Sequence, residues 1–171
     1  LLGHVRLSIL DLSERGRQPM ISADGRHALT YNGEVYNYRE LRESLEAEGV
    51  RFNGETDTEV VLAMLERFGC AALPRFKGMF AFCWVDLVKR EFTLVRDFFG
   101  IKPLYYTLHG GAVTFCSEQR SLLNLPGISR KVPPQRIYDF VRMAVPDDGR
   151  ATFFESIAQV PPAHYLKGPL D

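Results

Sequence analysis

The chain has 171 residues, enough for one domain with a substantial core. Its 21 Lys and Arg balance 21 Asp and Glu, so no overall charge indicates nucleic acid or an anionic membrane, and a small uncharged or zwitterionic ligand is the better expectation. Three widely spaced cysteines without a Cys-x-x-Cys pair predict neither a disulfide framework nor a metal site, and favour a reducing cytoplasm.

The N-terminal stretch is predicted to contain a strand that begins at Val5. It lacks the basic segment and long apolar run of a signal peptide, and no window of the sequence approaches the roughly 18 consecutive apolar residues of a membrane helix. Apolar and polar residues alternate from Val5 to Ile9, which predicts one buried face and places Arg6 on the other. Because the stretch has no initiator Met, we expect the chain to begin inside a longer protein.

A predicted loop, Asp11–Gly25, leads to the stretch His27–Tyr38, whose centre is Asn32-Gly33-Glu34. Asn-Gly is the strongest short-range turn signal because both residues tolerate positive φ, so we predict a hairpin turn at Asn32-Gly33. Most such turns are ordinary surface features. An amide side chain, a flexible backbone N–H and a carboxylate on three successive residues could also stabilise an oxyanion and bind an ammonium group.

Two helices are predicted after this stretch. Asn37 is the expected N-cap of the first helix, which Gly49 ends, and Thr56 is the expected N-cap of the second, which Gly69 ends. Each cap has a glutamate three residues later, the pattern of a capping box. A short strand is predicted between the two helices, at Val50–Asn53.

The pattern then changes to that of a sheet. Met79–Val85 is apolar on both faces and rich in aromatic residues, which predicts a strand buried inside a layered fold. Further strands are predicted at Phe92–Arg96, Leu104–Leu108 and Ala112–Cys116, followed by helices at Ser117–Leu123, with Ser117 as cap, and Pro134–Met143. The short connections favour an antiparallel meander, and the order of elements predicts an α+β fold in more than two layers.

The C-terminal stretch is predicted to be a connector. Val145–Asp171 is rich in proline and has no sustained period, although Ala163–Leu166 could form a last strand. We therefore expect a domain at residues 1–144, with its proline-rich end and a connector to a further domain at 145–171.

Three charged residues suggest a binding site. Taken singly, Arg6 is explained as a solvated strand arginine, Glu34 as an ordinary turn carboxylate and Asp57 as part of a helix N-terminus. Together they offer a guanidinium for an α-carboxylate and two carboxylates for an α-ammonium. That set is the polar complement of a free amino acid.

Several blocks of sequence identify a family resemblance along nearly the whole chain. They are Gly3-His4-Val5-Arg6-Leu7-Ser8-Ile9, Tyr31-Asn32-Gly33-Glu34-Val35-Tyr36-Asn37, Thr56-Asp57-Thr58-Glu59, Gly78-Met79-Phe80-Ala81-Phe82, Arg96-Asp97, Gly100-Ile101-Lys102-Pro103-Leu104-Tyr105-Tyr106 and Ser117-Glu118. With these blocks the chain resembles the class II (N-terminal nucleophile) glutamine amidotransferase domain of glutamine-hydrolysing asparagine synthetases. The resemblance implies an αββα sandwich of two mostly antiparallel sheets, of the Ntn-hydrolase kind.

The resemblance also implies roles for particular residues. Asn32 and Gly33 would form the oxyanion hole, where one donor contributes on the order of 3 to 4 kcal/mol of barrier lowering. Glu34 and Asp57 would hold the α-amino group of L-glutamine. The α-carboxylate would be bound by the first strand, through Arg6, Leu7, Ser8, Ile9 and Leu10. We interpret Arg96, Asp97 and Lys102 as structural residues or as part of a contact with a further domain.

The nucleophile of this family is a cysteine at the mature N-terminus, whose α-amino group, with a pKa of about 8, acts as base. The chain begins at Leu1, so we expect the nucleophile segment to be missing and these 171 residues to be inactive alone. Cys83 and Cys116 lie in predicted buried strands, and Cys70 follows a helix C-terminus, which disfavours a thiolate. The domain itself needs no cofactor; ATP and Mg²⁺ are implied for the synthetase domain, which is the expected partner in the same parent chain. A homodimer is a further option, and the usual nitrogen acceptor is aspartate.

Two other interpretations remain open from the sequence. One is a degenerate amidotransferase domain with a structural or docking role, as in β-lactam-synthetase-type relatives. The other is a sensor that binds glutamine without cleaving it. The retention of five residues argues mildly against decay, since we expect packing to require none of them: Arg6, Asn32, Gly33, Glu34 and Asp57. The residues that precede Leu1 in the parent protein would distinguish these possibilities.

Overall fold

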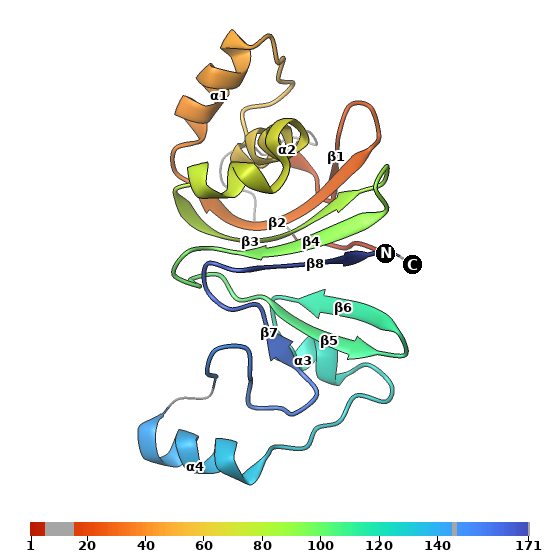
Figure 1. The fold of residues 1–171 in the computed structure, drawn as a ribbon, viewed down its shortest axis with the longest axis vertical. Coiled ribbons are helices and arrows are strands. Elements are labelled where there is room, and N and C mark those ends of the chain that lie inside the picture. The colour runs from red at the N-terminus through yellow and green to blue at the C-terminus, as the bar shows by residue number, and fades with distance from the viewer. Residues whose placement is uncertain (6–15, 145–146, 171) are drawn as a thin grey trace. The chain divides into compact units, whose positions relative to one another are not determined.

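The structure, a computed structural model, describes residues 1–5, 16–144 and 147–170 (Figure 1). Two compact units are present: one comprises Leu1–Leu94 with Lys167–Asp171, and the other comprises Val95–Leu166. The chain forms two sheets, and the strand pairs β1–β2, β2–β3, β5–β6 and β5–β7 are all antiparallel. The predicted α+β class with two antiparallel sheets is therefore confirmed.

The first unit contains most of a five-stranded sheet in the order β1-β2-β3-β4-β8. Its strands are β1 Met20–Ile21, β2 His27–Val35, β3 Gly78–Asp86, β4 Glu91–Arg96 and β8 Tyr165–Pro169, the last two of which run across the boundary between the units. Its helices are α1 Tyr38–Ala47, α2 Asp57–Phe68 and the 3₁₀ helix η2 Gly69–Arg75. Helix α2 lies against β2, and α1 lies beside α2 (Figure 1).

The core of the first unit lies between α2 and the sheet. β3 is buried from Phe80 to Asp86, as its apolar pattern predicted. The rings of Tyr31, Phe82, Phe80 and Phe76 form a chain of neighbouring contacts, with centroids 6.4, 5.7 and 5.8 Å apart in that order. This aromatic row fixes β2 beside β3 and so fixes the position of the residues that follow Tyr31.

The second unit contains a three-stranded sheet in the order β6-β5-β7. Its elements are β5 Tyr105–His109, β6 Ala112–Cys116, β7 Ala158–Gln159, α3 Gln119–Leu123 and α4 Pro134–Met143. The predicted bounds of α4 and β6 are confirmed. Two tail strands differ from expectation: β7 was not predicted, and β8 begins two residues later than the strand predicted at Ala163–Leu166.

The predicted turn at Asn32-Gly33 is wrong. β2 continues through both residues, and its register with β3 is unbroken from His27 to Val35. Gly33 does adopt a positive φ of 153°, but within the strand, where a Cβ would meet the Met79 carbonyl oxygen and Phe80. A Cβ at Gly78 would likewise meet the Glu34 carbonyl oxygen. The glycine of this dipeptide therefore permits a close approach of β2 to β3 rather than a reversal of the chain. The expectation that packing does not require Gly33 is also wrong.

Four smaller predictions also need correction. Val50–Asn53 is not a strand, and β1 lies inside the predicted loop. Asn37 is at the N-cap position but makes no cap bond, because its side chain bonds the Arg75 carbonyl and the Lys77 N–H. α3 is preceded by Glu118 at the cap position instead of Ser117. Thr56 does cap α2, since its Oγ1 accepts the Glu59 N–H at 3.3 Å.

Candidate functional site

The Asp57 carboxylate connects the start of α2 to the end of β2. Its Oδ2 accepts the Tyr31 hydroxyl at 2.7 Å and the Val35 N–H at 3.0 Å. Asp57 is 5% exposed, and capping does not explain it, because Thr56 caps the helix. Within the described residues, Oδ1 accepts no hydrogen bond and no cation lies within ion-pair distance of Asp57. In the described part of the chain, this buried carboxylate therefore has one oxygen available.

Tyr31 is held as a neutral hydrogen-bond donor to Asp57. Burial, then the charge of Asp57 and its hydrogen bond, then the charge of Glu34, raise the pKa of Tyr31 far above its ordinary value. The phenol is therefore a neutral donor at every physiological pH.

The edge of β2 that faces away from β3 carries backbone donors. Tyr31 N–H donates to Gln18 Oε1 at 2.6 Å, and Val35 N–H donates to Asp57. In an antiparallel ladder, N–H groups of alternate residues point the same way. The alternation directs the N–H of Gly33 to this same edge, between the other two.

The structure brings together four of the residues predicted for the site. Asn32, Gly33 and Glu34 lie opposite Ala81, Phe80 and Met79 in the register, half-buried, at the end of β2 that Asp57 contacts. The predicted carboxylate-binding residues lie outside the described residues; they are Arg6, Leu7, Ser8, Ile9 and Leu10.

Sequence reasoning missed Tyr31 and Gln18 as members of this site. One signal was available for Tyr31, since a tyrosine on a buried strand face needs a partner for its hydroxyl. That partner is 26 residues away, at Asp57, so the pairing was not visible from local pattern. Nothing in the sequence singled out Gln18.

Arg96 and Asp97 form a second polar cluster, in the second unit. The fully buried Asp97 carboxylate accepts the N–H groups of Phe99 and Ile101 on Oδ1 and of Lys102 on Oδ2, at 2.9 to 3.0 Å. Arg96 donates to the Lys102, Gly100 and Val160 carbonyls and to the Gln159 side chain, at distances of 2.7 to 2.9 Å. These bonds hold the loop after β4, which agrees with the structural interpretation of both residues.

None of the three cysteines is an activated thiol. Burial raises the pKa of Cys83 to about 12, and burial also raises the pKa of Cys116. Cys70 lies in η2, after the C-terminus of α2. The described residues hold no group of three or more His, Cys, Asp or Glu that could bind a metal ion, and no helix among them is long and apolar enough to span a membrane.

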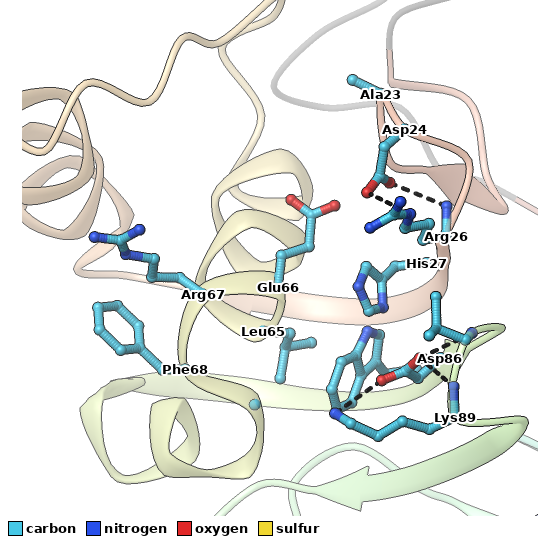
Figure 2. A pocket seen from close by; sticks show the side chains of 13 residues that line it. Ala23, Asp24, Arg26, His27, Leu65, Glu66, Arg67, Phe68, Asp86 and Lys89 are labelled. Carbon is cyan, nitrogen blue, oxygen red and sulfur yellow. Dashed lines mark hydrogen bonds and ion pairs between the residues drawn. The ribbon is translucent and has the colours of Figure 1, made fainter.

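A cavity of about 730 Å³ lies elsewhere in the first unit, beside the last turn of α2 (Figure 2). His27 stacks on Trp84 at its side, with ring centroids 5.5 Å apart. This end of α2 is roughly 12 Å or more from Asp57 at a rise of about 1.5 Å per residue. The cavity is therefore separate from the cluster around Asp57.

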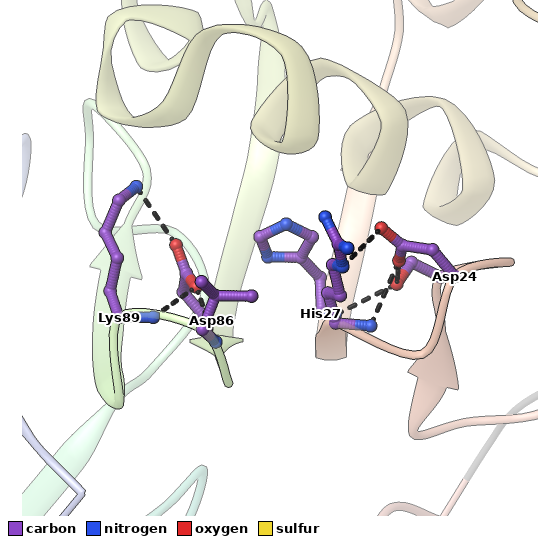
Figure 3. A network of polar contacts seen from close by, with 7 residues as sticks. Asp24, His27, Asp86 and Lys89 are labelled. Carbon is purple, nitrogen blue, oxygen red and sulfur yellow. Dashed lines mark hydrogen bonds and ion pairs between the residues drawn. The ribbon is translucent and has the colours of Figure 1, made fainter.

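The charges that line this cavity are largely paired with one another (Figure 3). Asp24 lies 3.6 Å from Arg26, and Asp86 lies 3.0 Å from Lys89. Burial opposes ionisation of Asp86, but hydrogen bonds and charge from Lys89, with a contribution from His27, lower its pKa below the ordinary value. Each ion pair lies within one turn, Asp24–Arg26 in the β1–β2 turn and Asp86–Lys89 in the β3–β4 turn.

Comparison with known proteins identifies sequence relatives over this same region. A family model described as "Glutamine amidotransferase domain" matches residues 1–169. Asparagine synthetase [glutamine-hydrolyzing] 1 of Bacillus subtilis (strain 168) is 46% identical over 121 residues, 71% of this chain and 19% of that protein. A putative asparagine synthetase [glutamine-hydrolyzing] of Methanocaldococcus jannaschii is 40% identical over 148 residues, 76% of this chain and 27% of that protein. The chain thus spans about a fifth to a quarter of the length of these relatives.

Solved structures show the same fold at low sequence identity. The glutamine phosphoribosylpyrophosphate amidotransferase of B. subtilis, complexed with ADP and GMP, gives a TM-score of 0.61 at 22% identity, over 98% of this chain and 34% of that one. An allosteric regulatory enzyme of purine biosynthesis gives 0.61 at 24% identity, over 89% of this chain and 29% of that one. These neighbours support the Ntn-hydrolase-like fold.

Proposed function

Because the chain belongs to the glutamine amidotransferase domain family, class II, we propose that it binds L-glutamine at the end of β2 and supplies ammonia to an asparagine synthetase. Glu34 and Asp57 hold the α-ammonium, and Arg6 with the strand that follows it holds the α-carboxylate. Asn32 and Gly33 donate to the oxyanion. The observation that carries this proposal is the buried Asp57 carboxylate, which has one oxygen available beside the Asn32-Gly33-Glu34 stretch.

The spacing of donors along β2 suits glutamine. Alternate residues of a strand are about 7 Å apart, so the Gly33 N–H lies about that far from the Val35 N–H, next to which Asp57 is held. The ammonium nitrogen and side-chain carbonyl oxygen of glutamine are separated by five covalent bonds, an extended reach of about 6 Å. One glutamine molecule can therefore contact Asp57 and the Gly33 N–H together.

The reaction is acyl transfer to a cysteine thiol. The sulfur attacks the side-chain carbonyl carbon, and the C–N bond breaks as the thiol proton passes, through an amine base, to the departing ammonia. Water then cleaves the thioester to give glutamate and restores the thiol. The Asn32 amide and the Gly33 N–H stabilise the negative oxygen in both steps. The α-ammonium stays bound to Glu34 and Asp57 in both steps.

We assign the nucleophile to a part of the parent protein outside these 171 residues. The three cysteines within them are buried, have a raised pKa or lie at a helix C-terminus, so none supports this chemistry. A polypeptide of these 171 residues alone is expected to release no glutamate from glutamine. The synthetase part of the parent protein, with ATP and Mg²⁺, would use the ammonia to amidate aspartate.

The test uses the parent protein with its natural N-terminus. Asn32→Ala is expected to lower kcat for glutamine hydrolysis by about 10²-fold or more, because an oxyanion donor acts only in the transition state. Asn124→Ala, an exposed change in the second unit, is the matched control and should leave kcat unchanged. A rise in KM alone for Asn32→Ala would assign Asn32 to ground-state binding, and parent protein without any glutaminase activity would favour the degenerate domain.

A further inference from the structure

We infer that Tyr31 is a positioning residue, which orients Asp57 so that its second carboxylate oxygen faces the α-ammonium of the substrate. The inference rests on the proposed glutamine site and adds a residue to it. Tyr31 itself makes no contact with the substrate. It acts through the 2.7 Å hydrogen bond from its hydroxyl to Asp57 Oδ2.

The hydrogen bonds of Asp57 fix the orientation of its carboxylate. Both donors, the Tyr31 hydroxyl and the Val35 N–H, bind the same oxygen, Oδ2. A planar carboxylate that accepts two hydrogen bonds at one oxygen cannot rotate without breaking both hydrogen bonds. The direction of Oδ1 is therefore fixed as well. The substrate ammonium would therefore meet an oxygen that is already in place.

The charge balance around Asp57 indicates a cationic ligand. A buried carboxylate is costly unless a cation compensates it, and no cation is within ion-pair distance of Asp57 among residues 1–5, 16–144 and 147–170. Both of its donors are neutral, since burial and the adjacent carboxylates keep the Tyr31 phenol protonated by raising its pKa. The α2 N-terminus contributes only partial positive charge. The ammonium of an amino acid would supply the full positive charge that the described residues do not place beside Asp57.

Tyr31 is itself held firmly enough to act in this way. Its side chain is 3% exposed, its ring packs on Phe82 at 6.4 Å, and its N–H is bound by Gln18 Oε1 at 2.6 Å. Each of these contacts survives in Tyr31→Phe, which removes the hydroxyl alone. The variant therefore separates the positioning role from the packing role.

The experiment measures kcat and KM in the parent protein for two substrates, L-glutamine and glutaramate, which is glutamine without its α-amino group. For Tyr31→Phe we expect KM for glutamine to rise about fivefold to tenfold, the loss of about one hydrogen bond, with kcat changed less than twofold. Kinetics with glutaramate should not change. Tyr36→Phe, at an exposed tyrosine of the same stretch, is the control and should match the unmodified protein.

The outcomes separate this inference from the proposed function. Asp57→Asn should remove most of the preference for glutamine over glutaramate; if the preference stays, the ammonium site itself is wrong. If Asp57→Asn removes the preference but Tyr31→Phe keeps it, the site stands and the positioning role is overturned. An equal loss with both substrates for Tyr31→Phe would show a general packing role and would also overturn it.

Discussion

Two buried aspartates, one in each unit, differ in the hydrogen bonds that they accept. This difference distinguishes a structural carboxylate from one that is available to bind a ligand. Asp97 is fully buried and receives three backbone N–H groups, which engage both of its oxygens. Asp57 is nearly as buried but receives two donors, both on Oδ2. Each aspartate belongs to a sequence block of the family, and the resemblance implied a binding role for Asp57, whereas Asp97 was interpreted as structural or as part of a contact with a further domain.

The difference indicates what each carboxylate is for. Asp97 is satisfied by the loop that it organises, so the fold accounts for its charge and burial. In the described part of the chain, Asp57 has an available oxygen and no cation beside it. The fold therefore explains the position of Oδ2 but not the burial of a full negative charge. Substitution of Asp97 should therefore lower the free energy of unfolding strongly, and substitution of Asp57 should change it little. Substitution of Asp57 should instead change the kinetics with the substrate.

The largest stability effect is expected for Asp97→Asn. The amide NH₂ would oppose one of the backbone N–H groups and the negative charge would be lost, which should lower the free energy of unfolding by about 3 kcal/mol. Asp57→Asn should change it by less than about 1 kcal/mol, because the amide oxygen can still accept from Tyr31 and Val35. Urea unfolding of both variants checks this, and equal losses would end the distinction between the two aspartates.

A smaller effect is expected for Gly33→Ala, which tests whether the Asp57 site depends on the close approach of β2 to β3. A Cβ at residue 33 would meet the Met79 carbonyl oxygen, so the strands must separate, with a loss of about 2 kcal/mol or more and weaker glutamine binding. Gly25→Ala is the matched control, because it also has a positive φ but has open space around it. That change should cost about 1 kcal/mol and leave binding intact. Similar behaviour of the two variants would contradict the close-approach argument.

The smallest effect concerns Asp86, a carboxylate whose charge has a cation within the fold. Its pKa is lowered in the folded state, so its contribution is present above the ordinary carboxyl pKa of about 3.9 and is lost as the pH falls through the folded value. Lys89→Met should therefore reduce the free energy of unfolding by about 0.5 kcal/mol at pH 7. The loss should be smaller at about pH 3, below the ordinary carboxyl pKa, because Asp86 is then partly protonated. A loss of equal size at both pH values would assign the effect to packing.

The sequence predicted elements well where apolar residues followed a clear period. β3, α2 and α4 were placed almost to the residue, since an apolar run, a capping residue or a first-turn proline marks each of them. The Asn32-Gly33 turn failed because the same positive-φ tolerance that permits a turn also permits two strands to approach closely. Local pattern cannot choose between these uses.

The site was predicted in part, for a related reason. Asn32, Gly33, Glu34 and Asp57 were found through motifs, and the structure places them at one end of β2. Tyr31 and Gln18 were missed because each acts through a partner 13 or 26 residues away, a contact that only the folded chain reveals. The predicted roles of the four residues found through motifs, like that of Arg6, stay predictions.

The most direct test is a crystal structure of the parent protein with L-glutamine bound and its nucleophilic cysteine replaced by alanine. The proposed site predicts the substrate ammonium within about 3 Å of Asp57 Oδ1, with the Tyr31 hydroxyl still on Oδ2. A glutamine whose ammonium lies beyond hydrogen-bond reach of Asp57, with Oδ1 bound instead by a cation of the protein, would contradict it.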